Sequence, residues 1–252
     1  MLNHPTLDQL KEMKLSGMAL AFEEQLQRAD YNDLSFNERL GFLVEREHSV
    51  RANRQLTYRL RRAQLKLHAS IEDLDQRVPR GLDKSFINEL ARSRFINDHL
   101  NVLITGPTGV GKTYLACAIA HSACRNGFSA RYLRVPRLLT DLTIARGDGT
   151  WSKVLAQLAK TDLVILDDWG LATLDAEQRR DLLDILDDRH GLRSTVVTSQ
   201  LPVKQWHEII GDPTLADAIL DRLVHNAYTI NLKGESMRKK QANLTQADHS
   251  AQ

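Results

Sequence analysis

The sequence predicts an α/β fold in which a five-stranded parallel sheet is flanked by helices, preceded by a small all-helical domain. Three observations predict it. From residue 100 onward, short apolar runs rich in Val, Ile and Leu alternate with helix-like segments. A glycine-rich turn follows the first of these runs and leads into an Ala- and Leu-rich segment. Residues 1–68 have a helical pattern, and the 252-residue chain, 42% hydrophobic, is long enough for both parts.

The N-terminal region contains a clear helix-start signal and no nearby stop signal. Residues Ser35-Phe36-Asn37-Glu38 fit a capping box, in which Ser and Glu side chains satisfy the first free N–H groups of a helix. No Gly or Pro occurs between Gly41 and Pro79. The sequence therefore predicts one long helix from Phe36 to about His68.

The second half of that helix is strongly basic. From Arg46 to Lys66 there are seven Lys and Arg residues and one acid, Glu47. On one side, at helical spacing, fall Leu56, Leu60, Ala63 and Leu67, and roughly opposite fall Arg51, Arg54, Arg61 and Arg62. Either this is a solvated face of a surface helix, or it contacts a polyanion. Solvated faces usually mix signs, so the uniform charge favours the polyanion, even though the net charge of the chain is only +2.

The remaining elements follow in order along the chain. Residues 70–79 read as a linker, followed by a helix over 84–96. The predicted strands cover 100–105, 130–135, 163–167, 195–198 and 228–232, and the predicted helices between them cover 112–125, 137–145, 151–160, 176–190 and the region up to residue 225. The polar tail, 241–252, is expected to be disordered.

The glycine-rich turn has the form of a phosphate-binding loop. Residues 106–113 read G-P-T-G-V-G-K-T, between a predicted buried strand and a predicted helix. That context directs backbone N–H groups and a helix N-terminus at a polyphosphate. The Lys112 ammonium can reach the β- and γ-phosphates, and the Thr113 hydroxyl can hold Mg²⁺. A chance match in a glycine turn is the alternative. The predicted ATP-contacting residues are Gly106, Pro107, Thr108, Gly109, Val110, Gly111, Lys112, Thr113 and Tyr114.

Two carboxylates follow the predicted third strand. Asp167 and Asp168 end the apolar run 163–166, so a parallel sheet would bring them to the edge that carries the phosphate loop. Asp167 is then placed to hold Mg²⁺ through water, and Asp168 to orient or activate the attacking water. The alternative is an acidic helix start.

Composition limits the classes of function. Cys117 and Cys124 lie seven residues apart on one predicted helix, which suits two reduced core residues and neither a disulfide nor a zinc site. The chain shows no signal peptide and no apolar run long enough to cross a bilayer, so we expect a cytoplasmic protein with no membrane partner.

Five segments together resemble the IstB-type AAA+ ATPases, the helper proteins of IS21-family transposons, which are related to DnaC-type helicase loaders. These segments are G-P-T-G-V-G-K-T (106–113), I-L-D-D-W-G (165–170), T-S-Q-L-P (198–202), L-D-R-L (220–223) and G-E-S-M-R (234–238). The resemblance is strong over roughly residues 70–240 and extends into the N-terminal helices.

The resemblance assigns roles to three further residues. Gln200 falls at the polar sensor-1 position, although the family more often has Asn there. Arg222 falls at the arginine-finger position, which reaches the ATP of a neighbouring subunit, and Arg238 resembles a sensor-2 arginine. A surface arginine is the alternative for both. Asp168 replaces the Glu of the wider AAA+ class, and its shorter side chain predicts slow turnover.

The function that this resemblance implies is an ATP-dependent helper of transposition. Residues 1–68 would bind DNA or a partner, 69–240 would form the ATPase domain and 241–252 the tail. ATP and Mg²⁺ between subunits would assemble a homo-oligomer on double-stranded DNA, which recruits the cognate transposase. A DnaC-type loader, which would prefer single strands, is the alternative, and a metabolic kinase fits poorly. The predicted DNA contacts are Arg51, Arg54, Arg59, Arg61, Arg62, Lys66, Arg131, Arg134, Arg137 and Lys153.

Overall fold

The structure is a computed structural model that describes residues 5–75 and 80–237. The chain divides into two compact units, Met1–Tyr58 and Arg59–Gln252. No helix in these described ranges is both long and apolar enough to cross a bilayer.

The first unit contains only helices in its described residues. They are α1 (Pro5–Glu12), α2 (Ser16–Gln27), the 3₁₀ turn η1 (Ala29–Tyr31) and most of α3 (Phe36–Ala63). The Ser35 capping box is confirmed: the Ser35 N–H donates to the Glu38 carboxylate at 2.8 Å, and the Glu38 N–H donates to the Ser35 hydroxyl at 3.4 Å. The helical character predicted for this region is therefore correct.

A carboxylate from α3 caps the N-terminus of α2. The N-terminus of α2 has no side-chain cap of its own at Leu15. Instead, the buried Glu47 accepts hydrogen bonds from the N–H groups of Gly17 (2.7 Å) and Met18 (3.1 Å). A negative group at this position also interacts favourably with the helix dipole. Glu47 thus joins the two helices, and Arg51 pairs with it at 2.6 Å.

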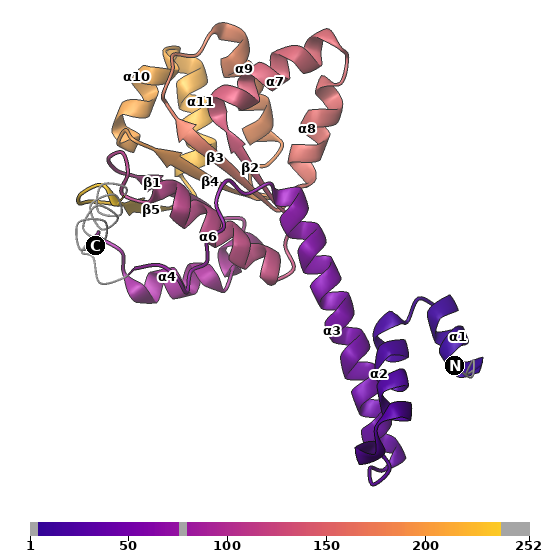
Figure 1. Cartoon of the computed structure of the whole chain (residues 1–252). Helices are drawn as coiled ribbons and strands as arrows, with labels where there is room; N and C mark the ends of the chain where they lie inside the picture. The colour runs from indigo at the N-terminus through magenta and orange to yellow at the C-terminus, as the bar shows by residue number, and fades with distance from the viewer. Residues whose placement is uncertain (1–4, 76–79, 238–252) are drawn as a thin grey trace, which may run out of the picture. The chain divides into compact units, whose positions relative to one another are not determined.

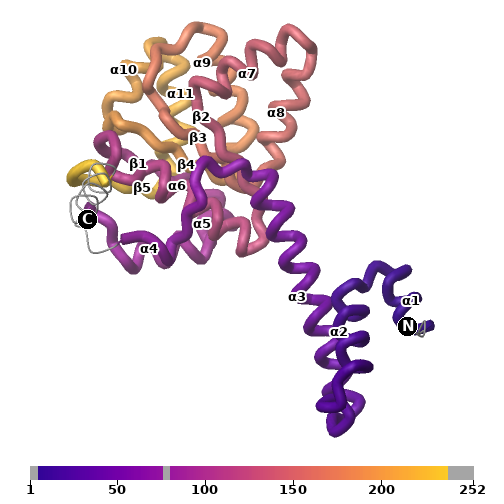
Figure 2. The backbone as a smooth tube through the Cα atoms, in the orientation of Figure 1, coloured from indigo at the N-terminus to yellow at the C-terminus, as the bar shows by residue number. Residues whose placement is uncertain are grey.

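The predicted end of α3 is wrong by about five residues. The helix stops at Ala63, and Gln64 adopts a left-handed backbone with φ of +49°. The chain then runs along α6 (Lys112–Arg125), where Glu72 pairs with Arg125 at 2.5 Å (Figure 2). Nothing in the sequence, such as Gly or Pro, marks this turn.

The second unit is built on a five-stranded parallel sheet, which confirms the predicted fold class (Figure 1). Its strand order is β2-β3-β4-β1-β5, and every pairing is parallel. The strands are β1 (Asn101–Thr105), β2 (Ala130–Arg134), β3 (Leu163–Trp169), β4 (Ser194–Ser199) and β5 (Ala227–Asn231). Because all strands point the same way, the segments that follow them meet at one edge of the sheet.

Helices cover both faces of this sheet. One face carries α6, which packs on β1 to β4, with α4 (Lys84–Ala91) beside it. The other face forms the main core with α7 (Val135–Gly147), α8 (Trp151–Lys160), α9 (Ala176–Asp187), α10 (Trp206–Ile210) and α11 (Pro213–Val224) (Figure 1). The predicted helix over 84–96 is interrupted, because the buried Ser93 is left-handed and a short helix, α5 (Arg94–Asn97), follows it.

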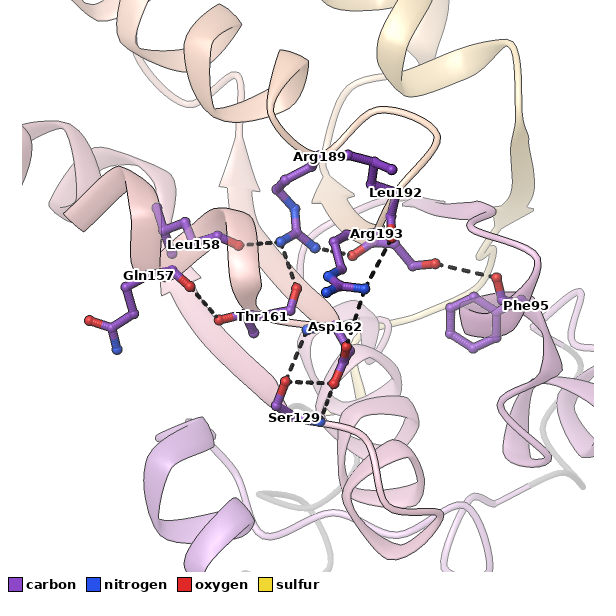
Figure 3. Close-up of polar contacts among 10 residues, drawn as sticks. Phe95, Ser129, Gln157, Leu158, Thr161, Asp162, Arg189, Leu192 and Arg193 are labelled. Atoms are coloured by element: carbon purple, nitrogen blue, oxygen red, sulfur yellow. Dashed lines mark hydrogen bonds and ion pairs between the residues drawn. The ribbon is translucent and has the colours of Figure 1, made fainter. Parts of the chain in front are cut away.

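The amino ends of the strands are held by a buried arginine. Figure 3 shows Arg189, which follows α9, among the polar groups at this edge. Its guanidinium donates to the carbonyls of Leu158 (2.5 Å) and Thr161 (2.8 Å) at the end of α8, and to the carbonyl of Ser194 at the start of β4. These contacts lie at the edge opposite the phosphate loop, so they hold the scaffold and leave the other edge for the site.

Candidate functional site

The phosphate loop lies between the end of β1 and the start of α6. Gly106 has φ of +144°, and a Cβ placed there would lie 2.2 Å from the carbonyl oxygen of Leu232. At Gly109, with φ of +85°, it would lie 2.2 Å from the Ser236 hydroxyl. Both positions therefore require glycine. The segment after β5 closes over the loop, where the Met237 N–H donates to the Gly109 carbonyl at 2.9 Å.

The start of α6 is suited to bind an anion. Its first residues have no side-chain cap at Gly111, so the first N–H groups of the helix are left for another acceptor. The Lys112 ammonium lies over the loop and donates to the carbonyls of Gly106 (2.7 Å) and Pro107 (2.8 Å). A bound phosphate would offer this ammonium stronger, charged acceptors in place of these carbonyls.

Asp167 is the buried centre of the site, with no exposed surface. Its carboxylate accepts hydrogen bonds from the hydroxyls of Thr113 (3.0 Å), Tyr132 (2.5 Å) and Thr198, which come from α6, β2 and β4. Burial, together with the hydrogen bond to Asp167, raises the pKa of Tyr132 well above its usual range, so Tyr132 remains a donor. Tyr132 and Thr198 were not predicted from the sequence. Only the strand order brings them to Asp167.

The donor set around Asp167 fits Mg²⁺. This ion is usually held by one or two carboxylates together with hydroxyl, water and phosphate oxygens. Thr113 donates its proton to Asp167, which leaves the lone pairs of its oxygen available to a cation. The described residues hold no cluster of three or more His, Cys, Asp or Glu side chains suited to a metal, so the remaining ligands would be phosphate and water.

Asp168 lies at a bulge in β3. Its φ is +63°, and the pairing of β3 with β4 shifts register between Leu166 and Trp169. Strained residues of this kind cluster at functional sites. The bulge lets Asp168 follow Asp167 into the site, where its carboxylate accepts from the Arg134 guanidinium at 2.8 Å. This ion pair raises the pKa of Arg134 and occupies the carboxylate that the sequence analysis assigned to the attacking water.

One pocket of about 660 Å³ is bordered by the phosphate loop together with Thr113, Arg134 and Asp168. Gln200, directly after β4, lies in its wall and accepts a hydrogen bond from the Thr108 hydroxyl at 2.7 Å. The structure therefore places the predicted sensor-1 residue beside the phosphate loop. Further lining residues were missed by the sequence analysis: Leu67, Asp73, Leu74, Asp75, Arg80, Leu171 and Met237.

Arg80 supports the phosphate loop through a hydrogen bond to its backbone. Its side chain is buried, and it donates to the carbonyls of Val110 (3.3 Å) and Asp75 (2.5 Å). It also limits the space at Gly111, where a Cβ would lie 3.0 Å from its guanidinium. An arginine next to a linker carries no recognisable motif, so its role could be seen only in three dimensions.

Arg222 lies far from the pocket of its own chain. Its backbone carbonyl accepts a hydrogen bond from the side chain of Asn101, the first residue of β1, whereas the phosphate loop follows the last residue of that strand. Its guanidinium pairs with Asp187 at 2.8 Å and is 29% exposed. Arg222 therefore takes no part in the phosphate site of its own chain. Arg238, the predicted sensor-2 residue, lies outside the described residues.

The predicted DNA contacts fall into two groups. In the first group, Arg59 donates to the carbonyl of Cys124, Arg131 to that of Arg62, and Arg134 to Asp168. Lys66 lines the pocket of about 660 Å³ beside the phosphate loop, hereafter the nucleotide pocket. The second group is exposed on the surface of its unit and consists of Arg51, Arg54, Arg61, Arg62, Arg137 and Lys153. Within this group Arg51 pairs with Glu47, Arg54 donates to Ser16, and Arg137 lies 3.9 Å from Asp141.

The chain is similar in sequence to a known family of ATP-binding proteins. The sequence model of the family described as IstB-like ATP binding protein matches residues 8–245. The chain is 54% identical over 241 residues to the insertion sequence ATP-binding protein y4pL of Sinorhizobium fredii (strain NBRC 101917 / NGR234), covering 96% of this chain and 98% of that protein.

Among solved structures, the chain is similar to bacterial helicase-loader folds. The crystal structure of DnaI has a TM-score of 0.57 and 26% identity, and the match covers 66% of this chain and 92% of that one. The crystal structure of the DnaC helicase loader has a TM-score of 0.54 and 19% identity, and covers 68% of this chain and 100% of that one. The DnaC likeness shows the fold alone.

Proposed function

This chain belongs to the IstB-like ATP-binding protein family, and on that premise we propose that it is an ATP-dependent, DNA-binding helper of transposition. In this proposal ATP and Mg²⁺ bind between subunits and assemble an oligomer on duplex DNA. The oligomer then recruits and stimulates the cognate transposase, and hydrolysis times its disassembly. The observation that carries the proposal is the position of Arg222, at the sheet edge opposite its own phosphate loop.

The nucleotide chemistry follows from the site. The loop N–H groups, the α6 N-terminus and Lys112 would bind the phosphates, and Thr113 with Asp167 would hold Mg²⁺. When bound, this ion neutralises charge on the β- and γ-phosphate oxygens. Asp168 would orient the attacking water, and Gln200, beside Thr108, is within reach of the same region. Asp168 becomes available for this role when the Arg134 guanidinium moves away, or when the carboxylate binds the guanidinium and the water together.

Arg222 would complete the site of a neighbouring subunit. A guanidinium supplied from outside stabilises the charge that develops on the transferred phosphoryl group. Since no chain can supply its own Arg222, hydrolysis would depend on assembly. This dependence suits a switch, because ATP turnover would then report that the oligomer has formed.

The extent of the likeness favours a transposition helper over a helicase loader. The identity with the insertion sequence protein extends over 96% of the chain, which includes the N-terminal helices. The match to DnaI covers 66% of this chain and 92% of that one, so the solved DnaI chain offers no counterpart for the remaining third. The likeness of the N-terminal helices therefore rests on the insertion-sequence relatives. Its basic helix would contact DNA phosphates without reading sequence, as a helper that accepts many targets requires.

The proposal is tested by fluorescence anisotropy of the full chain on DNA. A duplex of about 50 base pairs, long enough for several bound subunits, is compared with a single strand of equal length at fixed salt. Each is titrated with ATP, a non-hydrolysable analogue or ADP present. We expect cooperative binding to the duplex when ATP or its non-hydrolysable analogue is present, and not when ADP is present. Preference for the single strand, or indifference to the nucleotide, would instead indicate a loader.

A further inference from the structure

A lysine lies beside the carboxylate that would hold Mg²⁺. The Lys66 ammonium is 3.9 Å from Asp167 Oδ2, and Lys66 lines the same pocket as Lys112 and Thr113. Asp167 is fully buried, whereas the Lys66 side chain is 39% exposed. The only charged partner near this buried carboxylate among the described ion pairs is therefore a half-exposed cation on a flexible stem.

The backbone that carries Lys66 is fixed on the ATPase unit. The last turn of α3 is tied down where Arg59 donates to the Cys124 carbonyl at 2.8 Å and Arg131 donates to the Arg62 carbonyl at 3.0 Å. Beyond Lys66, the apolar side chains of Ala69 and Ile71 are buried. Anchors on both sides hold Lys66 at Asp167, so its position is set by the fold and not by a loose loop.

We infer that Lys66 is a built-in competitor of Mg²⁺: its ammonium neutralises Asp167 when no Mg²⁺–nucleotide complex is bound and withdraws when that complex binds. This inference rests on the proposed ATP and Mg²⁺ site. Two cations a few ångströms apart repel each other strongly in a partly buried pocket. The phosphates already have Lys112 and the loop N–H groups, and Lys66 can turn into solvent, so Lys66 is the cation that yields.

Lys66 also links the nucleotide to the basic helix. It follows the exposed Arg61 and Arg62 by only a few residues, directly after α3 ends at Ala63. Withdrawal of its side chain from Asp167 would remove one of the contacts that hold this end of α3. A change in the bound nucleotide would thereby affect the residues proposed to contact DNA, through the backbone that connects them to Lys66.

The test measures how Mg²⁺ changes nucleotide affinity. A fluorescent, non-hydrolysable ATP analogue is titrated onto the full-length wild type and Lys66→Met, once with excess MgCl₂ and once with EDTA. In Lys66→Met we expect tighter binding with MgCl₂ and weaker binding with EDTA, because Asp167 is then left uncompensated. The ratio of the two dissociation constants, Kd in EDTA over Kd in MgCl₂, should rise by about two- to fivefold, as for a partly exposed ion pair.

Two results would overturn the inference. Equal weakening in both conditions would make Lys66 a phosphate ligand, and an unchanged ratio with unchanged affinities would make it a bystander. Lys66→Arg, which keeps the charge, should retain the wild-type ratio, and Lys84→Met replaces an exposed lysine on α4 as the matched control. Lys66→Gln provides a second neutral variant in case Lys66→Met does not fold, as judged by thermal melting. Absence of binding by the wild type would instead refute the proposed function.

Discussion

The ion pair between Arg134 and Asp168 occupies the carboxylate that is proposed to orient the attacking water. Arg134 ends β2, its side chain is half-exposed, and its Nε lies 2.8 Å from Asp168. A carboxylate that is bound to a guanidinium has fewer free lone pairs with which to hold the attacking water. If Asp168 orients the attacking water, as proposed, this pair would lower basal turnover, and its opening would accompany activation.

Arg134→Ala should raise basal ATP hydrolysis without DNA by about two- to fivefold, which corresponds to the loss of one partly exposed ion pair. Phosphate release from the full chain measures it. Arg137→Ala serves as the control, since Arg137 is 82% exposed and only approaches Asp141. A lower basal rate in Arg134→Ala would mean that Arg134 assists catalysis instead of restraining it.

The length of the Asp168 side chain should also limit the stimulated rate. A carboxylate set back by one bond orients water less well, and positioning losses are costly in rate. We expect turnover with DNA to stay below about 10 s⁻¹ per subunit, the median for enzymes. Asp168→Asn should lower it further by about a hundredfold while ATP binding is retained, as equilibrium binding and steady-state hydrolysis would measure. Faster turnover by the wild type would refute the argument.

At the scale of elements, local patterns predicted the strands and helices that carry the phosphate loop. The run before Gly106 and the segment after Gly111 became β1 and α6 because apolar pattern, glycine turn and helix propensity all agree there. The end of α3 at Ala63 and the break at Ser93 could not be predicted, since neither Gln64 nor Ser93 is a residue that favours a left-handed backbone. At Ser93 the partner comes from a distant part of the chain, where the Asn126 side chain donates to the Ser93 hydroxyl at 2.9 Å.

The contact between α2 and α3 should depend on pH. The hydrogen bond from Arg51, together with the Gly17 and Met18 amides, lowers the pKa of Glu47 below its ordinary value of 4.5. A lowered carboxylate pKa means that its contribution to stability is present above about pH 4.5 and is lost as the pH falls further. Hydrogen exchange of α2 peptides, corrected for the intrinsic effect of pH, should show this loss of protection in the wild type. Glu47→Gln should be less protected at neutral pH and should lack the pH-dependent step.

At the scale of the molecule, the sequence could show where positive charge gathers but not how the fold uses it. Arg59, Arg131 and Arg134 donate to groups of their own unit, and Lys66 lies in the nucleotide pocket. Charge counted along a helix cannot reveal such contacts, because the partners come from distant elements. The roles of Tyr132 and Arg80 could not be predicted from the sequence either, because their partners also come from other elements. Arg61 and Arg62 are exposed near the end of α3 and stay among the predicted DNA contacts.

If Arg61 and Arg62 contact phosphates, each replacement should reduce the salt dependence of DNA affinity. Each lost phosphate contact lowers the slope of log affinity against log salt by about one unit. Anisotropy titrations of Arg61→Ala and Arg62→Ala at several salt concentrations measure this slope. Lys84→Ala, on α4, is expected to leave it unchanged, and an unchanged slope in the arginine variants would remove α3 from the DNA interface.

The position of Arg222 predicts that ATP hydrolysis depends on assembly of the oligomer. Arg222→Ala should lose hydrolysis by about a thousandfold or more, as when an arginine finger is removed, and still bind ATP. Asp187→Asn removes the ion pair at 2.8 Å and leaves the guanidinium and its longer pair with Asp221 at 3.7 Å, so this variant should stay active if Arg222 has a role beyond the pair with Asp187. A simple structural role would make both variants equally unstable in thermal melts and equally inactive.

Mixing then separates action between subunits from action within one. Asp168→Asn lacks the water-orienting carboxylate but keeps Arg222, and Arg222→Ala has the converse defect. In a head-to-tail oligomer that mixes both at random, about a quarter of the sites combine an intact Asp168 with an intact Arg222 from the neighbour. Hydrolysis should therefore reappear on mixing to about a quarter of the wild-type rate. Two variants that stay inactive when mixed would show that Arg222 does not serve a neighbouring site, and the dependence of turnover on assembly would lose its physical basis.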